Sequence, residues 1–153
     1  MANTYSQIYI HLVFAVKHRQ HLTHQGFKDE LYKYIAGIIR NKGQKLLAIN
    51  GMPDHIHIFI GLEPDMKLSD LVRDIKSASS LFVNEKHLSK QKFHWQEGYG
   101  AFSYSQSQRS FVIKYIMEQE KHHGKRTFRT EYHELLKKFE TAFEEKYLFE
   151  FFD

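Results

Sequence analysis

The chain has 153 residues, enough for one domain of ordinary size, and its 42% hydrophobic content can fill a core. No apolar run approaches the roughly 20 residues of a membrane span, which argues against a transmembrane protein, and the absence of Cys excludes disulfides, thiolate metal sites and cysteine nucleophiles. The net charge of +4 is unevenly distributed: residues 1–130 carry +8 (19 basic, 11 acidic) and residues 131–153 carry −4 (3 basic, 7 acidic). This distribution is typical of a domain that binds a polyanion, but also of an ordinary solvated surface of mixed charge.

Hydrophobic periodicity predicts eight secondary-structure elements in one domain, with a core at about 5–124 and an acidic helical tail at about 130–153. In chain order they are a strand at 5–16, a helix at about 23–41, strands at 44–51 and 55–62, a helix from near Ser69 through Phe82, a strand at 98–105, a helix from about 108 to His123, and a helix at about 130–146. We expect Ser69 to cap the second helix and Gly124 to end the third in a left-handed conformation.

The order strand, helix, strand, strand, helix, strand predicts an α+β, ferredoxin-like (RRM-like) fold. This fold has a four-stranded antiparallel sheet with helices on one face. We therefore expect the other face to be open to a ligand, and the two additional helices to follow the sheet.

The strand at 55–62 places two histidines together. Period-2 alternation directs Ile56 and Ile58 toward the helices, and puts His55 and His57 on the opposite face with Phe59. The two imidazoles are then about 6–7 Å apart, close enough to share one cation. The alternative is a pair of surface histidines, since 11 His make one His-x-His expected by chance. On an open face, replacing His57 should leave stability nearly unchanged.

The third predicted helix carries a tyrosine beside its apolar stripe. Val112 and Ile116 belong to that stripe, whereas Tyr115, Gln119 and His122 form a neighbouring stripe. Gln119 follows the tyrosine by one turn, so both can enter the same site. The alternative is an amphipathic Tyr at the rim of the core with a solvated Gln.

Several segments in the same order resemble the single-tyrosine transposases of small insertion sequences, including the REP-associated tyrosine transposases. The segment NGMPDHIHIFIGL (50–62) resembles their His-hydrophobic-His (HUH) motif, and VIKYIMEQEKHH (112–123) is similar to their catalytic helix, in which a Gln follows the Tyr by four residues. Three other segments also look like family sequence: HLVFAVKHR, KSASS and WQEGYGAFSYS. The resemblance covers nearly the whole chain.

The resemblance implies a metal-dependent enzyme that cleaves and rejoins single-stranded DNA through a 5′-phosphotyrosine. It makes Tyr115 the nucleophile, and His55, His57 and Gln119 the ligands of a divalent cation, Mg²⁺ or Mn²⁺. One of the histidines at 122–123 could assist. It also implies that the protein recognises hairpins at element ends and forms a homodimer with exchanged tyrosine helices. A protein of this kind, without the basic and then apolar start of a signal peptide, is expected in the cytoplasm.

Aromatic and basic side chains are the candidates for DNA contact. Candidates for stacking on bases are Tyr5, Tyr9, Phe59, Trp95 and Tyr99, and candidates for contacting phosphates are Arg19, Lys42, Lys45, Lys76, Arg109, Lys114, Lys121, Lys125 and Arg126. Two other functions stay open. One is a non-catalytic module that binds single-stranded nucleic acid on an RRM-like sheet, and the other is a metal-dependent hydrolase with a water nucleophile.

Overall fold

A computed structural model of the chain describes residues 3–17, 25–89 and 91–151. Its strands are β1 (Tyr9–Ala15), β2 (Lys45–Met52), β3 (His55–Gly61) and β4 (Gly100–Tyr104). Its helices are α1 (Gln25–Asn41), α2 (Leu68–Glu85), α3 (Arg109–Met117), α4 (Gln119–His123) and α5 (Phe128–Lys138), with short 3₁₀ turns at 106–108 and 145–147. The strands form one antiparallel sheet in the order β2-β3-β1-β4, which confirms the predicted ferredoxin-like arrangement.

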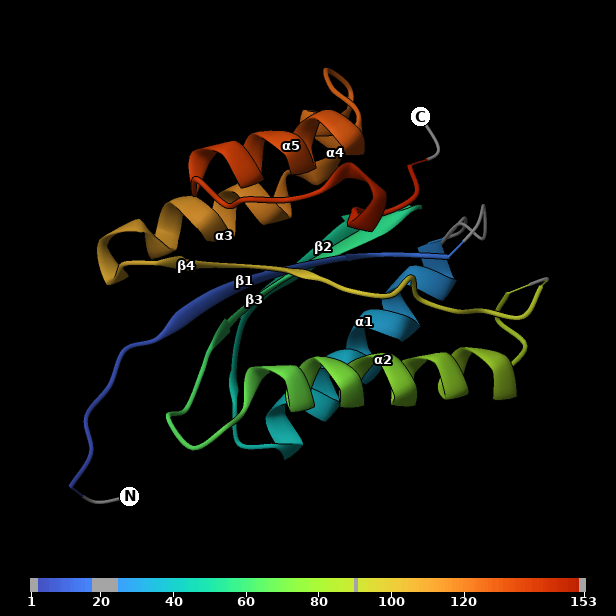
Figure 1. Cartoon of the computed structure of the whole chain (residues 1–153). Helices are drawn as coiled ribbons and strands as arrows, with labels where there is room; N and C mark the ends of the chain where they lie inside the picture. Colours follow the sequence, from blue (N-terminus) through green and yellow to red (C-terminus); the bar gives the residue numbers. More distant parts are fainter. Residues whose placement is uncertain (1–2, 18–24, 90, 152–153) are drawn as a thin grey trace.

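Alternation along β3 gives the sheet its two differently packed faces. Ile56, Ile58 and Ile60 are fully buried in one hydrophobic cluster with Leu31 of α1 and Leu71 of α2. Figure 1 shows α1 and α2 side by side on this face of the sheet. This layer forms as the period-2 and helical patterns predict, because each apolar stripe meets another one.

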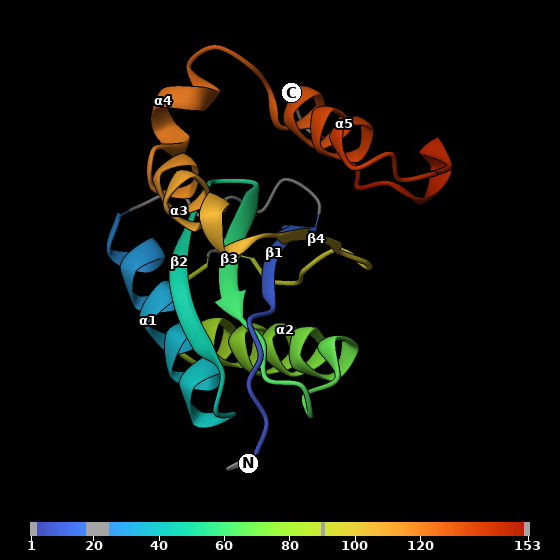
Figure 2. The same ribbon diagram turned by 90° about the vertical axis from the view of Figure 1, so that its left-hand side faces the viewer.

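The second face of the sheet is covered, contrary to the prediction of an open face. Helices α3, α4 and α5 lie on it, opposite α1 and α2 (Figure 1), with α3 and α4 beside β2 in Figure 2. Val112 and Ile116 of α3 are buried in a cluster with Phe59. The physical reason is that the apolar stripe of α3 also has to leave water, and this sheet face is the apolar surface available to it.

The third predicted helix is broken at Glu118, whose backbone (φ −103°, ψ 29°) is not helical. Asn50 of β2 donates hydrogen bonds from Nδ2 to the carbonyl oxygens of Ile116 (3.0 Å) and Met117 (3.3 Å). The carbonyls at the end of α3 are therefore satisfied by the sheet, and α4 starts in a new position at Gln119. Periodicity within one segment cannot reveal this contact, which joins residues far apart in sequence.

Three further details differ from the predictions. Ser69 does not cap α2, because the helix already begins at Leu68. Its N-cap residue is Lys67, whose side chain makes no capping hydrogen bond. Gly124 ends α4 in a right-handed conformation (φ −68°). The last helix is shifted and shorter, and starts after Thr127, whose side chain accepts a hydrogen bond from the backbone N–H of Thr130.

The C-terminal segment packs against the sheet. Four residues of α5 are buried in the main hydrophobic cluster together with Phe149: Phe128, Tyr132, Leu135 and Leu136. Only two acidic residues of this segment, Glu131 and Glu134, lie on α5, which has one apolar face, and the others come after the helix ends at Lys138. Within the described residues, no helix combines the length and the apolar character that crossing a membrane requires.

Candidate active site

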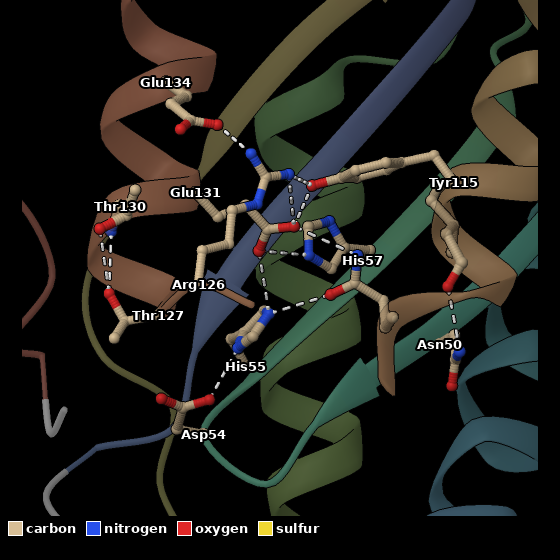
Figure 3. A network of polar contacts seen from close by, with 12 residues as sticks. Asn50, Asp54, His55, His57, Tyr115, Arg126, Thr127, Thr130, Glu131 and Glu134 are labelled. Carbon is tan, nitrogen blue, oxygen red and sulfur yellow. Dashed lines mark hydrogen bonds and ion pairs between the residues drawn. The ribbon is translucent and has the colours of Figure 1, made fainter. Parts of the chain in front are cut away.

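Two histidines of β3 converge on one buried carboxylate of α5. The Nε2 atoms of His55 and His57 lie 3.3 and 3.2 Å from Oε1 of Glu131 (Figure 3). All three side chains are fully buried, and their possible ligand atoms lie within 4.8 Å of one another. The predicted shared direction of the two histidines is therefore present in the structure, but on a covered face.

Gln119 joins this cluster from the first residue of α4. Its Oε1 lies 3.3 Å from Nε2 of His55, and its Nε2 donates a hydrogen bond to Oε2 of Glu131 (3.2 Å). The side chain is fully buried. The break after α3 places it there, since the helix that carries Tyr115 stops before Gln119 begins the next one.

Tyr115 reaches the same carboxylate from α3. Its hydroxyl donates a hydrogen bond to Oε2 of Glu131 and accepts one from Nη2 of Arg126 (2.7 Å), as Figure 3 shows. Its ring stacks on His122, with 4.6 Å between ring centroids. Burial and the negative charge of Glu131 raise the pKa of Tyr115 well above its usual value. In this arrangement the tyrosine therefore keeps its proton.

Glu131 is the central residue that sequence reasoning missed. It contacts His55, His57, Gln119 and Tyr115, which come from three other elements. One signal was available, because the buried face of α5 is otherwise apolar and aromatic. A carboxylate on such a face needs charged or hydrogen-bonding partners, since burying it alone is very costly.

Each histidine is also held at its other ring nitrogen. Nδ1 of His55 lies 2.7 Å from Oδ1 of Asp54, and Nδ1 of His57 lies 2.7 Å from Nε2 of His11 on β1. Burial alone would lower the pKa of His55, but hydrogen bonds to Asp54 and Glu131 more than offset this and raise it. Burial and neighbouring His57 lower the pKa of His11, which is therefore neutral.

The donor atoms in this cluster fit a divalent cation. Two imidazole nitrogens, a carboxylate oxygen and an amide oxygen form a mixed N and O set of the kind that binds Mn²⁺, Zn²⁺ or Mg²⁺. His55, His57 and Glu131 could hold the ion, and Gln119 is beside them. Such histidines normally have their second nitrogen hydrogen-bonded, as both do here.

The other residues chosen for DNA contact differ in exposure. Tyr5 is 92% exposed, whereas Tyr9, Phe59 and Trp95 are buried in hydrophobic clusters or at their edge and cannot stack on bases in this arrangement. Lys76 donates hydrogen bonds to two backbone carbonyls, and burial lowers the pKa of its ammonium to about 8. Arg19 and the side chain of His123 lie outside the described part of the chain.

Comparisons with known proteins show the family of the chain. The family described as "Transposase IS200 like" matches residues 4–119, about three quarters of the chain. The chain belongs to this family of transposases. It is 27% identical over 118 residues to the ISDra2 transposase TnpA of Deinococcus radiodurans (74% of this chain, 84% of that protein), and 29% identical over 108 residues to the IS200 transposase of Salmonella typhimurium (65% and 68%).

Two solved structures have the same fold. One, from Deinococcus radiodurans R1 and described as a transposase, has a TM-score of 0.60 and 28% identity, covering 76% of this chain and 94% of that one. The other is a REP-associated tyrosine transposase bound to a REP hairpin, with a TM-score of 0.60 and 19% identity, covering 80% of this chain and 72% of that one. This protein is thus a transposase enzyme with a candidate metal site.

The buried site changes the prediction for His57. We expect His57→Ala to abolish Mn²⁺ binding in calorimetry and also to lower the free energy of unfolding by about 1–3 kcal/mol, because His11 and Glu131 each lose a buried partner. The exposed His94 is the control, since His94→Ala should bind Mn²⁺ normally and change stability by less than about 0.5 kcal/mol. Unchanged Mn²⁺ binding by His57→Ala would exclude His57 as a ligand.

A second prediction concerns pH. Because the folded protein raises the pKa of His55, the protonated form stabilises the metal-free fold below the unfolded pKa of about 6.5, and this stabilisation disappears as pH rises through the folded pKa. We expect the stability difference between the parent and His55→Gln, measured by urea unfolding with a chelator, to shrink as pH rises above about 6.5. A difference that grows with pH would contradict the raised pKa.

Proposed function

We propose that this transposase cleaves and rejoins single-stranded DNA through a 5′-phosphotyrosine, with Tyr115 as nucleophile. His55, His57 and Gln119 would hold the divalent cation, with Glu131 as an additional ligand. The observation that supports this most directly is that the Tyr115 hydroxyl and the Nε2 atoms of both histidines meet at the same carboxylate. A nucleophile and a metal site can therefore act on one phosphate.

The neighbours of Tyr115 suit a proton transfer and a charged transition state. Oε2 of Glu131 already accepts the tyrosine proton in a hydrogen bond, so it is positioned to take that proton as the Tyr115 oxygen attacks phosphorus. The P–O3′ bond would break and O3′ would take up a proton from solvent, leaving a 5′-phosphotyrosine and a free 3′-OH. Arg126 is 2.7 Å from the tyrosine oxygen and can stabilise negative charge on the phosphate. A bound divalent cation supplies Lewis-acid polarisation of the phosphodiester.

Access to Tyr115 in this arrangement is narrow. A hollow of about 180 Å³ between α3 and α5 is lined by Tyr115, Arg126 and Glu131, together with apolar residues such as Phe111 and Leu135. Sites for drug-sized ligands are typically at least about 300 Å³, so a nucleotide needs more room. We infer that α5 moves away from α3 when a DNA strand enters.

The proposed substrate is single-stranded DNA that forms a hairpin. The structure with the same fold that is bound to a REP hairpin supports this choice, as does the net charge of +8 on residues 1–130. A non-catalytic RRM-like module is disfavoured, because such modules bind nucleic acid on an open sheet face and this face is covered by α3, α4 and α5.

The subunit arrangement is the remaining part of the proposal. The resemblance implies a homodimer with exchanged tyrosine helices. In the single chain, however, Tyr115 lies beside its own His57, with 6.1 Å between ring centroids, and Asn50 attaches the end of α3 to the chain's own β2. One chain can thus bring the nucleophile and the metal ligands together, and we propose that the site is complete within one chain, although exchanged helices would make the same contacts between two chains.

Replacing Tyr115 by Phe tests the nucleophile. This change removes one oxygen and keeps the ring, so we expect hairpin binding to persist and the covalent protein–DNA adduct to disappear. The readout is a denaturing gel with a labelled single-stranded hairpin, followed by mass spectrometry of the adduct peptide. Tyr104→Phe, on β4, is the matched control and should form the adduct. An undiminished adduct with Tyr115→Phe, or a nucleotide found on another residue, would reject this mechanism.

Mixing two inactive variants tests the subunit arrangement. His57→Ala lacks a metal ligand and Tyr115→Phe lacks the nucleophile, so a mixture can regain activity only if sites combine residues from two chains. We expect the mixture to stay inactive while differently tagged subunits are shown to associate. Recovered cleavage would instead establish exchanged tyrosine helices.

A further inference from the structure

His11 is the partner of His57 on the side away from Glu131. It lies on β1, opposite Phe59 of β3 and Phe102 of β4, and is fully buried. Its Nε2 is 2.7 Å from Nδ1 of His57, a hydrogen bond that needs one proton between the two nitrogens. Its other nitrogen, Nδ1, is buried without a hydrogen-bond partner among the described residues.

The contacts of His57 indicate which nitrogen carries the proton without metal. Nε2 of His57 faces a carboxylate oxygen of Glu131 at 3.2 Å, so it is the nitrogen that donates. A neutral His57 then has a lone pair on Nδ1, and His11 must donate its Nε2–H to that lone pair. The unpartnered Nδ1 of His11 is in this state a bare acceptor.

Metal binding requires the opposite arrangement. A cation takes the lone pair of Nε2, so a neutral His57 has to carry its proton on Nδ1. The Nε2 proton of His11 then passes along the hydrogen bond to Nδ1 of His57, the cation displaces the proton of His57 Nε2 to solvent, and Nδ1 of His11 takes up one proton from solvent. Both rings stay neutral, and only the positions of the protons change.

Asp54 provides the contrast at the neighbouring ligand. A carboxylate only accepts hydrogen bonds, so Asp54 keeps the proton of His55 on Nδ1. A histidine can accept or donate at the same nitrogen, and His11 can therefore support His57 in both states. The two histidine ligands thus have different hydrogen-bond partners at Nδ1, a carboxylate for His55 and an imidazole for His57.

We propose that His11 is a positioning residue for His57, and that the two imidazoles exchange tautomers together when a divalent cation binds. This inference rests on the metal site of the proposed function. His11 does not touch the ion or the DNA. It holds the ring of His57 with Nε2 directed at the site, and it accepts a hydrogen bond from the Nδ1–H that the ligand form of His57 requires.

Calorimetry with Mn²⁺ on the full chain tests the positioning role. His11→Leu removes the hydrogen-bond partner of His57 and fills the space with an apolar side chain. The amide of His11→Gln can instead donate a hydrogen bond to His57 or accept one from it. We expect His11→Leu to bind Mn²⁺ about 10- to 100-fold more weakly than the parent, and His11→Gln to recover most of the affinity. Urea unfolding of each metal-free variant shows that it is folded when it is titrated.

Histidine side-chain ¹⁵N spectra of the parent protein test the exchange without any substitution. We expect the proton of His57 on Nε2 without Mg²⁺ and on Nδ1 at saturating Mg²⁺, with His11 changing from Nε2–H to Nδ1–H in parallel. The exposed His94 is the internal control and should not respond. A His57 proton on Nδ1 in both states, or a His11 spectrum that does not change, would overturn the exchange. This measurement uses the parent protein, so it can be made even if His11→Leu fails to fold.

The outcomes separate this inference from the proposed function. If the parent binds Mn²⁺ and His11→Leu binds it equally well, the positioning role is wrong and the metal site stands. If the parent binds neither Mn²⁺ nor Mg²⁺, the metal site is wrong and the inference about His11 is overturned with it.

Discussion

The burial of one carboxylate constrains this structure more than any other interaction. Glu131 is fully buried, and an ionised carboxylate in such surroundings is stable only with several charged or hydrogen-bonding partners. Those partners lie on β3, α3 and α4, so the position of α5 depends on the sheet and on the tyrosine helix. Docking of the last helix and assembly of the site are therefore one event.

Local patterns predicted the parts of this molecule that depend on near neighbours in sequence. Alternation in β3 separates the isoleucines from His55 and His57, and helical spacing places Tyr115 off the apolar stripe. The break at Glu118 and the covered sheet face were missed, because they depend on contacts between Asn50 and the end of α3 and between α5 and β3, which join residues far apart in sequence. Charge likewise predicted an acidic helical tail at about 130–153, although α5 has an apolar face that packs on the sheet and the helix ends at Lys138.

Covering the site has opposing physical effects. The ring of Phe128 stacks on His55 with 3.8 Å between centroids, which keeps water away from the cluster and strengthens the interactions among its charges. The same packing leaves a hollow of only about 180 Å³ beside Tyr115. In the proposed mechanism, the site would have to be dry and also open to a DNA strand, and the position of α5 would determine both.

Charge balance connects the state of the metal site to the state of the tyrosine. Burial and the negative charge of Glu131 both raise the pKa of Tyr115; burial would lower the pKa of His55, but Asp54 and Glu131 more than offset this and raise it. A divalent cation held by His55 and His57 would replace the proton of His55 and add positive charge next to Glu131. The carboxylate would then stabilise the protonated tyrosine less, because part of its charge is neutralised. In the proposed mechanism, Tyr115 would therefore keep its proton without the cation, and a bound cation would make that proton easier to remove.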